Sequence, residues 1–499
     1  MSQLSRRKFN ALLASIPTIA LLNRTPRVWS QATPMPSTWT NPQIPALPDG
    51  PYKPAWDSVS AHVIPDWYKD AKFGISMHWG LYAVPAHGSE WYVQHMYADK
   101  ATIQWHTDNF GPPDKFGYKD FMPKFTCAKW NPDEWASLFK DAGAKYIMPT
   151  VEHHDGFSMW DSDINPYNAK QMGPKRDVIG EMCTAMRKQG LKFGACNHSM
   201  EHFDFINPPA GLKTDVNDPG WAAFYNVADR SRADRVAFNQ RWLAKNIELI
   251  EKYQLDTLWW DNGANGRNLD PLKLHVFAHL YNRGLQWGKE VQMITKGNCS
   301  LGGHVEDYER QQRGATTIQA AQFEVHDSPG SRWCYLTNDH YWPSFDLVWR
   351  IVENTSKNGN VLFNIGPCPD GTIDPGYKRL FVDTGKWLKV NGQAIYSTRA
   401  WKKFGEGPSL NNKPAYTPQD IRFTTKGDTL FAIFMAWPGK EGVITSLPLS
   451  AGKIETVEML GHDAPLQFKQ DEKALTVSMP DAKPCDFAYS LKITGSTLT

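Results

Sequence analysis

The chain has 499 residues, of which 41% are hydrophobic and 21% charged, a composition that fits a folded globular protein and excludes an extended disordered one. Its formal net charge of +2 argues against nucleic acid or an anionic membrane as the main partner. The 21 tryptophans favour an enzyme that acts on glycans, because flat aromatic faces stack on the apolar faces of sugar rings.

The first 32 residues predict an export signal. A twin-arginine pattern, Ser5-Arg6-Arg7-Lys8-Phe9, precedes an apolar run from Ala11 to Leu22, and small residues near Ser30 and Ala32 offer a cleavage site. The apolar run is too short to serve as a retained membrane anchor. We therefore expect a bacterial periplasmic or secreted protein that has no membrane association after cleavage.

Residues 33–54 are rich in Pro, Thr and Ser and predict a linker or strap. In residues 55–405, buried strand-like runs then alternate with amphipathic helical runs. The predicted strands are 72–80, 146–151, 191–196, 256–260, 291–295, 322–325 and 361–366. This alternation predicts an α/β fold, a (β/α) TIM-like barrel. A doubly wound open sheet is the alternative, but no Gly-rich phosphate loop follows the first strand.

The last part of the chain, residues 406–499, has a different sequence pattern. Short strands are predicted at 421–425, 429–434 and 443–445, with turns such as Lys426-Gly427-Asp428 between them, and helical periodicity is absent. This pattern predicts a small all-β sandwich domain. It contains no cluster of residues with catalytic chemistry.

Two carboxylates stand at the ends of predicted strands. Asp261 follows Trp259 and Trp260, and the C-terminal ends of barrel strands carry the active site, so Asp261 is a candidate nucleophile between two indoles. The alternative is an Asp that closes a turn or caps a helix. Glu324 offers the second carboxylate that glycoside hydrolysis needs, and apolar neighbours favour its protonated form. The alternative for Glu324 is a helix cap or a surface ion pair.

His78, His153 and His154 also stand at strand ends. Adjacent histidines on a strand point to opposite faces, so His153-His154 does not predict a shared metal ion, and hydrogen bonds to substrate hydroxyls are expected instead. The seven cysteines are scattered without a Cys-x-x-Cys pair, which indicates neither a zinc site nor a dense disulfide scaffold. The sequence leaves open whether one or two disulfide bonds form. We predict neither a metal nor a cofactor.

Several motifs, in the right order, resemble the retaining α-L-fucosidases of glycoside hydrolase family 29. They are Lys72-Phe73-Gly74-Ile75-Ser76-Met77-His78-Trp79-Gly80, Gly88-Ser89-Glu90-Trp91, His153-His154-Asp155-Gly156, Leu258-Trp259-Trp260-Asp261 and Asn358-Gly359-Asn360-Val361-Leu362-Phe363-Asn364-Ile365-Gly366. The resemblance runs from about Trp67 to Trp401, and the β-rich tail fits the family's second domain. It implies an exo-acting enzyme that removes terminal α-L-fucose from fucosylated oligosaccharides or polysaccharides through a covalent intermediate.

The resemblance also implies roles for individual residues. Asp261 matches the family's nucleophile and Glu324 its acid/base, with Glu309 as the reserve candidate for the acid/base. Six residues match positions that hold the fucose ring: His78, Glu90, Trp91, His153, His154 and Trp259.

Two stretches depart from the family pattern. Cys196-Asn197-His198-Ser199 stands where the family usually carries a Tyr pair, and Thr295-Lys296-Gly297-Asn298 where it often has Asn-Asp-Arg. Loss of a stacking Tyr and of a forked Arg changes how the ring and its acid are held. Three alternatives therefore stay open: a hydrolase of α-galactosides, a hydrolase of modified or sulfated fucose, and a lectin-like pseudoenzyme. The sequence also leaves open whether the protein assembles into a homo-oligomer.

Overall fold

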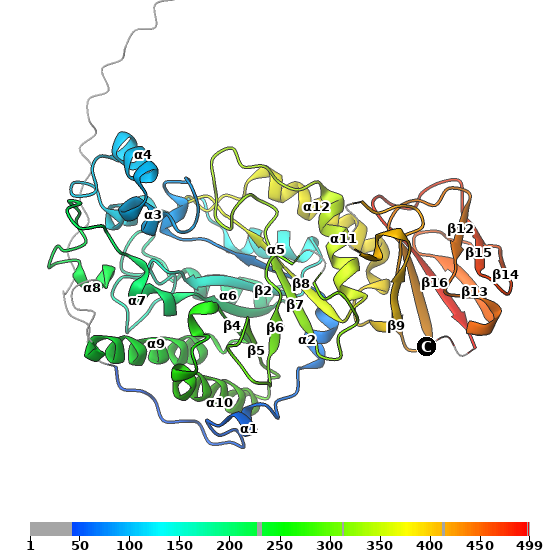
Figure 1. Cartoon of the computed structure of the whole chain (residues 1–499), viewed down its shortest axis with the longest axis horizontal. Helices are drawn as coiled ribbons and strands as arrows, with labels where there is room; N and C mark the ends of the chain where they lie inside the picture. The colour runs from blue at the N-terminus through cyan, green and yellow to red at the C-terminus, as the bar shows by residue number, and fades with distance from the viewer. Residues whose placement is uncertain (1–41, 227–231, 312–313, 412–414, 497, 499) are drawn as a thin grey trace, which may run out of the picture.

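The structure is a computed structural model that describes residues 42–226, 232–311, 314–411, 415–496 and 498. Eight parallel strands close into a barrel in the order β1 to β8 (Figure 1). The strands are β1 (Phe73–Met77), β2 (Tyr146–Glu152), β3 (Lys192–Asn197), β4 (Thr257–Trp260), β5 (Gln292–Thr295), β6 (Val305–Asp307), β7 (Phe323–Asp327) and β8 (Gly359–Ile365). The predicted TIM-like barrel is confirmed, and the open-sheet alternative is wrong because β8 pairs with β1.

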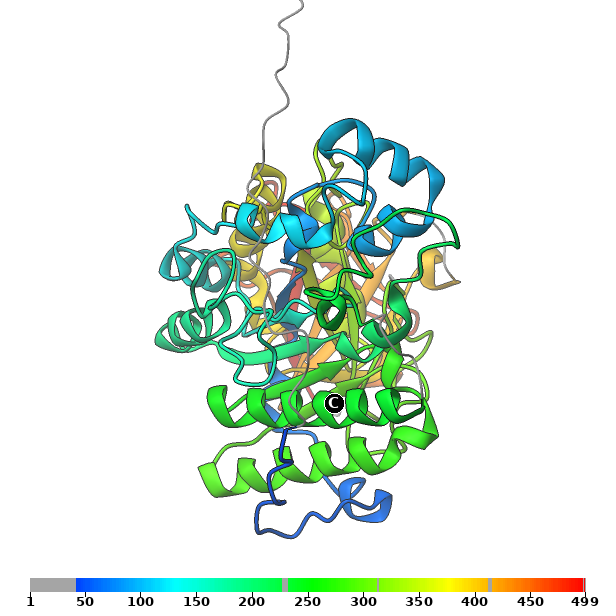
Figure 2. The same cartoon turned by 90° about the vertical axis from the view of Figure 1, so that its left-hand side faces the viewer.

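Helices surround the barrel strands (Figure 2). The longer ones are α5 (Pro132–Asp141), α6 (Val178–Lys188), α9 (Arg232–Tyr253), α10 (Asp270–Trp287), α11 (Ser344–Thr355) and α12 (Pro375–Asn391). Before the second strand, α3 (Tyr92–Ala98) and α4 (Lys100–Phe110) form an insertion. The Asn131 side chain accepts hydrogen bonds from the amides of Asp133 and Glu134 and thereby caps the N-terminus of α5.

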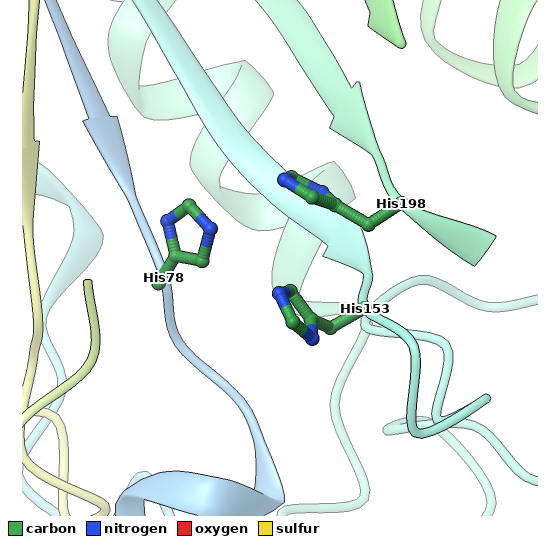
Figure 3. A group of neighbouring side chains, drawn as sticks. All are labelled: His78, His153 and His198. Atoms are coloured by element: carbon green, nitrogen blue, oxygen red, sulfur yellow. The ribbon is translucent and has the colours of Figure 1, made fainter. Parts of the chain in front are cut away.

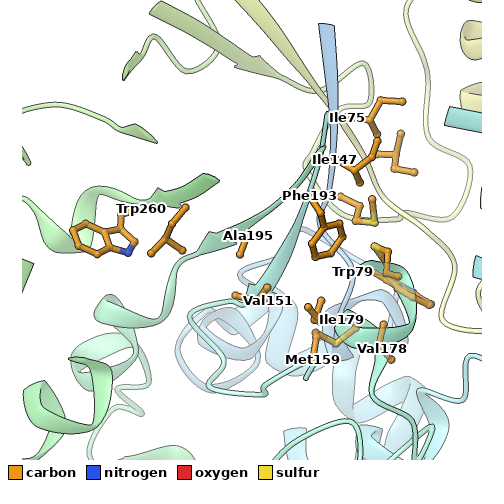
Figure 4. Close-up of a cluster of buried hydrophobic side chains, with 14 of the residues drawn as sticks. Ile75, Trp79, Ile147, Val151, Met159, Val178, Ile179, Phe193, Ala195 and Trp260 are labelled. Atoms are coloured by element: carbon orange, nitrogen blue, oxygen red, sulfur yellow. The ribbon is translucent and has the colours of Figure 1, made fainter. Parts of the chain in front are cut away.

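The barrel strands are buried on both faces, which explains their long apolar runs. Ile75, Ile147, Phe193 and Trp260 point outward toward the helices and belong to one large apolar cluster that also contains Val178 and Ile179 of α6 (Figure 4). A second, smaller cluster fills the barrel interior and includes Tyr146, Met148, Cys196, Trp259 and Leu362. Because alternate residues of a strand face opposite sides, this packing decides which side chains reach the barrel axis.

The C-terminal strands form two antiparallel sheets, which confirms the predicted small all-β domain. The five-stranded sheet contains β13 (Ile454–Met459), β16 (Tyr489–Gly495), β11 (Thr429–Phe434), β10 (Ile421–Lys426) and β9 (Arg399–Glu406); the three-stranded sheet contains β12 (Glu441–Ile444), β15 (Leu475–Ser478) and β14 (Phe468–Gln470). The sheet thus begins at Arg399, a few residues before the predicted start of the domain.

The C-terminal domain lies against α11 and α12 (Figure 1). The buried Glu353 carboxylate of α11 contacts the Arg422 guanidinium of β10 at 2.5 Å, and the Lys357 ammonium contacts the same carboxylate at 2.6 Å. The Trp387 indole of α12 donates a hydrogen bond to the Ala488 carbonyl. Removing one partner of such a buried ion pair leaves a charge without compensation, so these contacts hold the two domains in one arrangement.

Several expectations concern the ends and the cysteines of the chain. The predicted signal segment 1–32 lies outside the described residues. Part of the predicted strap is described, and it binds α10 through Asn282, whose amide donates to the carbonyls of Pro48 and Tyr52. All seven cysteines are described and none forms a disulfide. Among the described residues, no helix combines the length and the apolar character that crossing a bilayer requires.

Candidate active site

A cavity of about 540 Å³ opens at the C-terminal ends of the barrel strands. Its chemically active lining residues are four carboxylates, two cationic side chains, six histidines and three indoles: Glu90, Glu201, Asp261, Glu309, Lys296, Arg332, His78, His95, His153, His154, His198, His326, Trp91, Trp259 and Trp333. Many of them directly follow a strand, as the barrel geometry predicts. The volume fits a small organic ligand such as one sugar ring.

Asp261, directly after β4, is held by contacts with three residues. Its Oδ1 lies 2.5 Å from the Lys296 ammonium and accepts a hydrogen bond from the Asn262 amide, and its Oδ2 lies 3.5 Å from Nε2 of His154. Burial raises the pKa of Asp261, but the Lys296 ammonium and His154 outweigh burial and bring the pKa below its ordinary value. Asp261 is therefore ionised at neutral pH.

Only one of the two indoles before Asp261 faces the cavity. Trp259 lines the cavity, and its Nε1 donates to Asp307 Oδ2 at 3.2 Å. Trp260 points outward, where its Nε1 donates to Asn246 Oδ1. The expectation that two indoles flank Asp261 is wrong, because neighbouring residues of a strand face opposite sides.

All six predicted ring-binding residues line the cavity. His153 and His154 do so together because β2 ends at Glu152, so the two rings follow a turn and not a strand, with their centroids 4.2 Å apart. The Glu90 carboxylate accepts a hydrogen bond from the Trp333 amide. Trp91 is 41% exposed at the rim and offers a flat apolar face to a ligand.

The structure does not bring Glu324 to the cavity. Glu324 is the second residue of β7, and its Oε2 accepts hydrogen bonds from the hydroxyls of Tyr68 and Tyr146 inside the barrel, toward the N-terminal ends of the strands. Burial, and after it the neighbouring Asp307 carboxylate, raise the pKa of Glu324 well above its ordinary value. The expectation that Glu324 stands at the strand's C-terminal end is corrected: His326, two residues later on the same face, reaches the cavity instead.

Several cavity residues were not among those expected to hold the substrate or to do the chemistry, and Glu309 was only a reserve candidate. Glu201, His198, Lys296 and Glu309 follow β3, β5 or β6 and line the cavity. The Lys296 ammonium contacts both the Asp261 and the Glu309 carboxylates. His198 and Lys296 fall within the two stretches that depart from the family pattern. The sequence signal that could have identified them is therefore the departure from that pattern. The strand β6 before Glu309 is only three residues long and gives no periodic signal.

Comparisons with known proteins agree with this geometry. The family model described as "Alpha-L-fucosidase" matches residues 42–393, and that described as "Alpha-L-fucosidase C-terminal domain" matches residues 414–494. The tissue alpha-L-fucosidase of Bos taurus is 32% identical over 465 residues, which cover 89% of this chain and 91% of that protein.

A second relative and a solved structure match the chain as well. The plasma alpha-L-fucosidase of Homo sapiens is 31% identical over 467 residues, covering 89% of this chain and 92% of that protein. A crystal structure of Thermotoga maritima alpha-fucosidase in complex with fucose has a TM-score of 0.73 and 29% identity, covering 88% of this chain and 99% of that one. The chain therefore belongs to the α-L-fucosidase family and is a glycoside hydrolase.

Proposed function

We propose that the protein is an exo-acting, retaining α-L-fucosidase that releases terminal α-L-fucose from glycans. The observation that carries the proposal is the ionised Asp261 carboxylate, which faces a one-sugar cavity together with a second carboxylate, Glu309, and is bridged to it by the Lys296 ammonium. The relatives named as alpha-L-fucosidases support the choice of fucose.

The proposed reaction has two steps. Asp261 attacks the anomeric carbon, the bond from that carbon to the aglycone oxygen breaks, and Glu309 donates its proton to the departing oxygen. Water then attacks the covalent fucosyl-enzyme, Glu309 takes a proton from the water, and Asp261 leaves as a carboxylate. The Lys296 ammonium contacts both Asp261 and Glu309, so the two carboxyl groups lie close together. Such an arrangement fits the separation of about 5–5.5 Å in retaining enzymes better than the 6.5–9.5 Å in inverting enzymes.

Glu201 is the other carboxylate beside Asp261, but its position fits the acid/base role less well. Its side chain packs against the turn that carries the nucleophile, since a Cβ added at Gly263 would lie 2.5 Å from Glu201 Cγ. Its Oε2 faces the same His154 Nε2 that Asp261 faces, at 3.4 Å. The two carboxyl groups of a glycosidase must flank the bond that breaks, and Glu201 lies on the side of the nucleophile.

A substrate panel tests the proposal. We expect the purified protein to hydrolyse an aryl α-L-fucoside and release α-L-fucose first, as NMR of the fresh product would show, while an aryl α-galactoside reacts at least about 100-fold more slowly. A pocket that hydrogen-bonds to a specific substituent, or packs against it, discriminates between two sugars by a rate ratio of about this size. Faster turnover of the galactoside, or of a sulfated fucoside, would show that the substrate is that sugar and not fucose. Binding of fucose without turnover of any of these glycosides would indicate a lectin-like protein.

We also propose that the chain is exported through the twin-arginine route to the periplasm or beyond. The Ser5-Arg6-Arg7-Lys8-Phe9 pattern and the short apolar run after it support this proposal. Changing both Arg6 and Arg7 to Lys should leave the protein in the cytoplasmic fraction, whereas the unchanged chain should appear in the periplasmic fraction. Equal distribution of the two chains would contradict the proposal.

A further inference from the structure

Three histidines at the floor of the cavity face one another. His78, His153 and His198 follow β1, β2 and β3, and each offers a ring nitrogen within 4.8 Å of those of the other two (Figure 3). The rings of His153 and His198 are stacked, with centroids 4.8 Å apart, and the ring of His78 lies 5.0 Å from that of His198. Three imidazoles from three strands thus surround one point.

The hydrogen bonds of these histidines leave nitrogen atoms free for a ligand. Nδ1 of His153 and Nδ1 of His198 are buried and have no hydrogen-bond partner, although the two side chains are only 3% and 4% exposed. Nδ1 of His78 instead donates to Asn364 Oδ1 at 2.8 Å, which leaves Nε2 of His78 as a lone-pair donor. A metal-binding histidine is commonly oriented in this way by an oxygen on its second nitrogen.

The charge of the cavity also suits a cation. The lining contains four carboxylates, from Glu90, Glu201, Asp261 and Glu309, against two cationic side chains. The lining thus carries a formal excess of negative side chains.

We propose that His78, His153 and His198 form a binding site for a divalent transition metal, Zn²⁺ or its close analogue Co²⁺, at the floor of the cavity. Three imidazoles and a solvent ligand make a tetrahedral site of the kind these ions prefer. Zn–N bonds are about 2.0–2.1 Å, so the rings must approach one another by small rotations. Such rotations break no hydrogen bond at the Nδ1 atoms of His153 and His198.

The bound ion occupies space that the sugar ring needs, so metal and sugar exclude each other. This exclusion rests on the proposed function, whereas the metal site itself does not. The pair His153-His154 alone does not predict such a site; the third ligand, His198, comes from a stretch that departs from the family pattern. The protein is thus expected to be a fucosidase that free Zn²⁺ inhibits reversibly.

Titration of the untagged chain with Co²⁺ and with Zn²⁺ tests the metal site without any need for activity. We expect one tight site per chain, with the intense visible d–d absorption of tetrahedral Co²⁺ and release of Co²⁺ by Zn²⁺. His198→Phe keeps an aromatic ring against Trp259 but removes one ligand, and it should weaken binding by about 100-fold or more. His462→Ala, which removes an exposed histidine of the C-terminal domain, should leave binding unchanged.

Three results would overturn the metal site: absence of saturable binding, equal affinity in the wild type and His198→Phe, or loss of binding in Glu201→Gln while His198→Phe is unaffected. The last result would move the ion to the other group in the cavity, His154, Glu201 and Asp261. Thermal unfolding curves of each variant establish that the chain is folded before its affinity is compared. Fucose should displace Co²⁺ from the wild type; if Co²⁺ binds tightly but fucose fails to displace it, mutual exclusion is wrong and the metal site stands.

Discussion

Replacing Asp261 by Asn is expected to lower kcat for an aryl α-L-fucoside by about 10⁴-fold or more, because the amide cannot form the covalent intermediate. The side chain keeps its size, and Lys296 keeps its contact with Glu309, so the fold and the cavity persist. Fucose should still bind to the variant within about tenfold of the wild-type affinity. Steady-state kinetics and calorimetric titration with fucose measure the two quantities separately.

A matched control lies at the other end of the same strand. Asp256 precedes β4, is buried, and has Lys192 as a cationic partner at 3.3 Å, much as Asp261 has Lys296. Asp256→Asn should reduce stability, since its carboxylate accepts from the Phe193 amide, but leave kcat within a few-fold of the wild type. Equal loss of activity in both variants would contradict the assignment of Asp261.

The stereochemistry of rescue gives a second check on Asp261. In Asp261→Ala, azide can enter the space left by the carboxylate and attack the anomeric carbon directly, which yields β-L-fucosyl azide with inverted configuration. Formation of the α-azide by this variant would show that a covalent intermediate still forms, and the nucleophile would then be another residue.

The sequence patterns that predicted the fold best are those with a direct physical cause. The barrel strands are buried on both faces, so continuous apolar runs such as Tyr146–Glu152 were recognisable, and Asn131 before Pro132 identified the start of α5. The three-residue strand β6 was not predicted, because Val305–Asp307 contains two acidic residues and has no measurable period. The residue that β6 positions, Glu309, was consequently only a reserve candidate.

The candidate site was predictable where one residue directly follows a strand. Asp261, His78 and the His153-His154 pair all stand at strand ends and line the cavity. Which face a side chain takes within a strand was harder to judge: Trp260 turns outward, and Glu324 turns inward two residues short of the cavity. Contacts between distant segments, such as Lys296 with both Asp261 and Glu309, require the closed barrel and leave no pattern in the sequence.

Glu309→Ala is expected to lower kcat/KM for substrates with poor leaving groups, such as alkyl fucosides or natural glycans, by about 10²–10⁴-fold, the range of general acid catalysis. For a dinitrophenyl fucoside, whose leaving group needs no proton, the first step should change little and hydrolysis of the fucosyl-enzyme should become rate-limiting. Azide should then accelerate turnover and give α-L-fucosyl azide, because it attacks the intermediate on Asp261 from the face that water would use.

Glu324→Gln is the control, and its expected effect is on stability. Because burial raises the folded-state pKa of Glu324 above the ordinary value of 4.5, the folded state holds a proton that the unfolded state has released at higher pH. The wild type therefore loses up to about 1.4 kcal/mol of unfolding free energy per pH unit from this group between pH 4.5 and about pH 8, the folded-state pKa, and no more above it. Glu324→Gln should remove that part of the decline while leaving kcat/KM within a few-fold on both substrate types.

Loss of activity in Glu309→Ala alone does not identify an acid/base, because Glu309 also contacts the Lys296 ammonium. Without Glu309, that ammonium contacts Asp261 alone, and the nucleophile is then more strongly held by a positive charge. A purely electrostatic effect on the nucleophile would slow both substrate types equally and would not respond to azide. Dependence on the leaving group together with formation of the α-azide therefore separates proton transfer from a charge effect. If Glu201→Gln shows both features and Glu309→Ala shows neither, the proton is donated from the side of the turn that carries the nucleophile, and Glu201 takes the role.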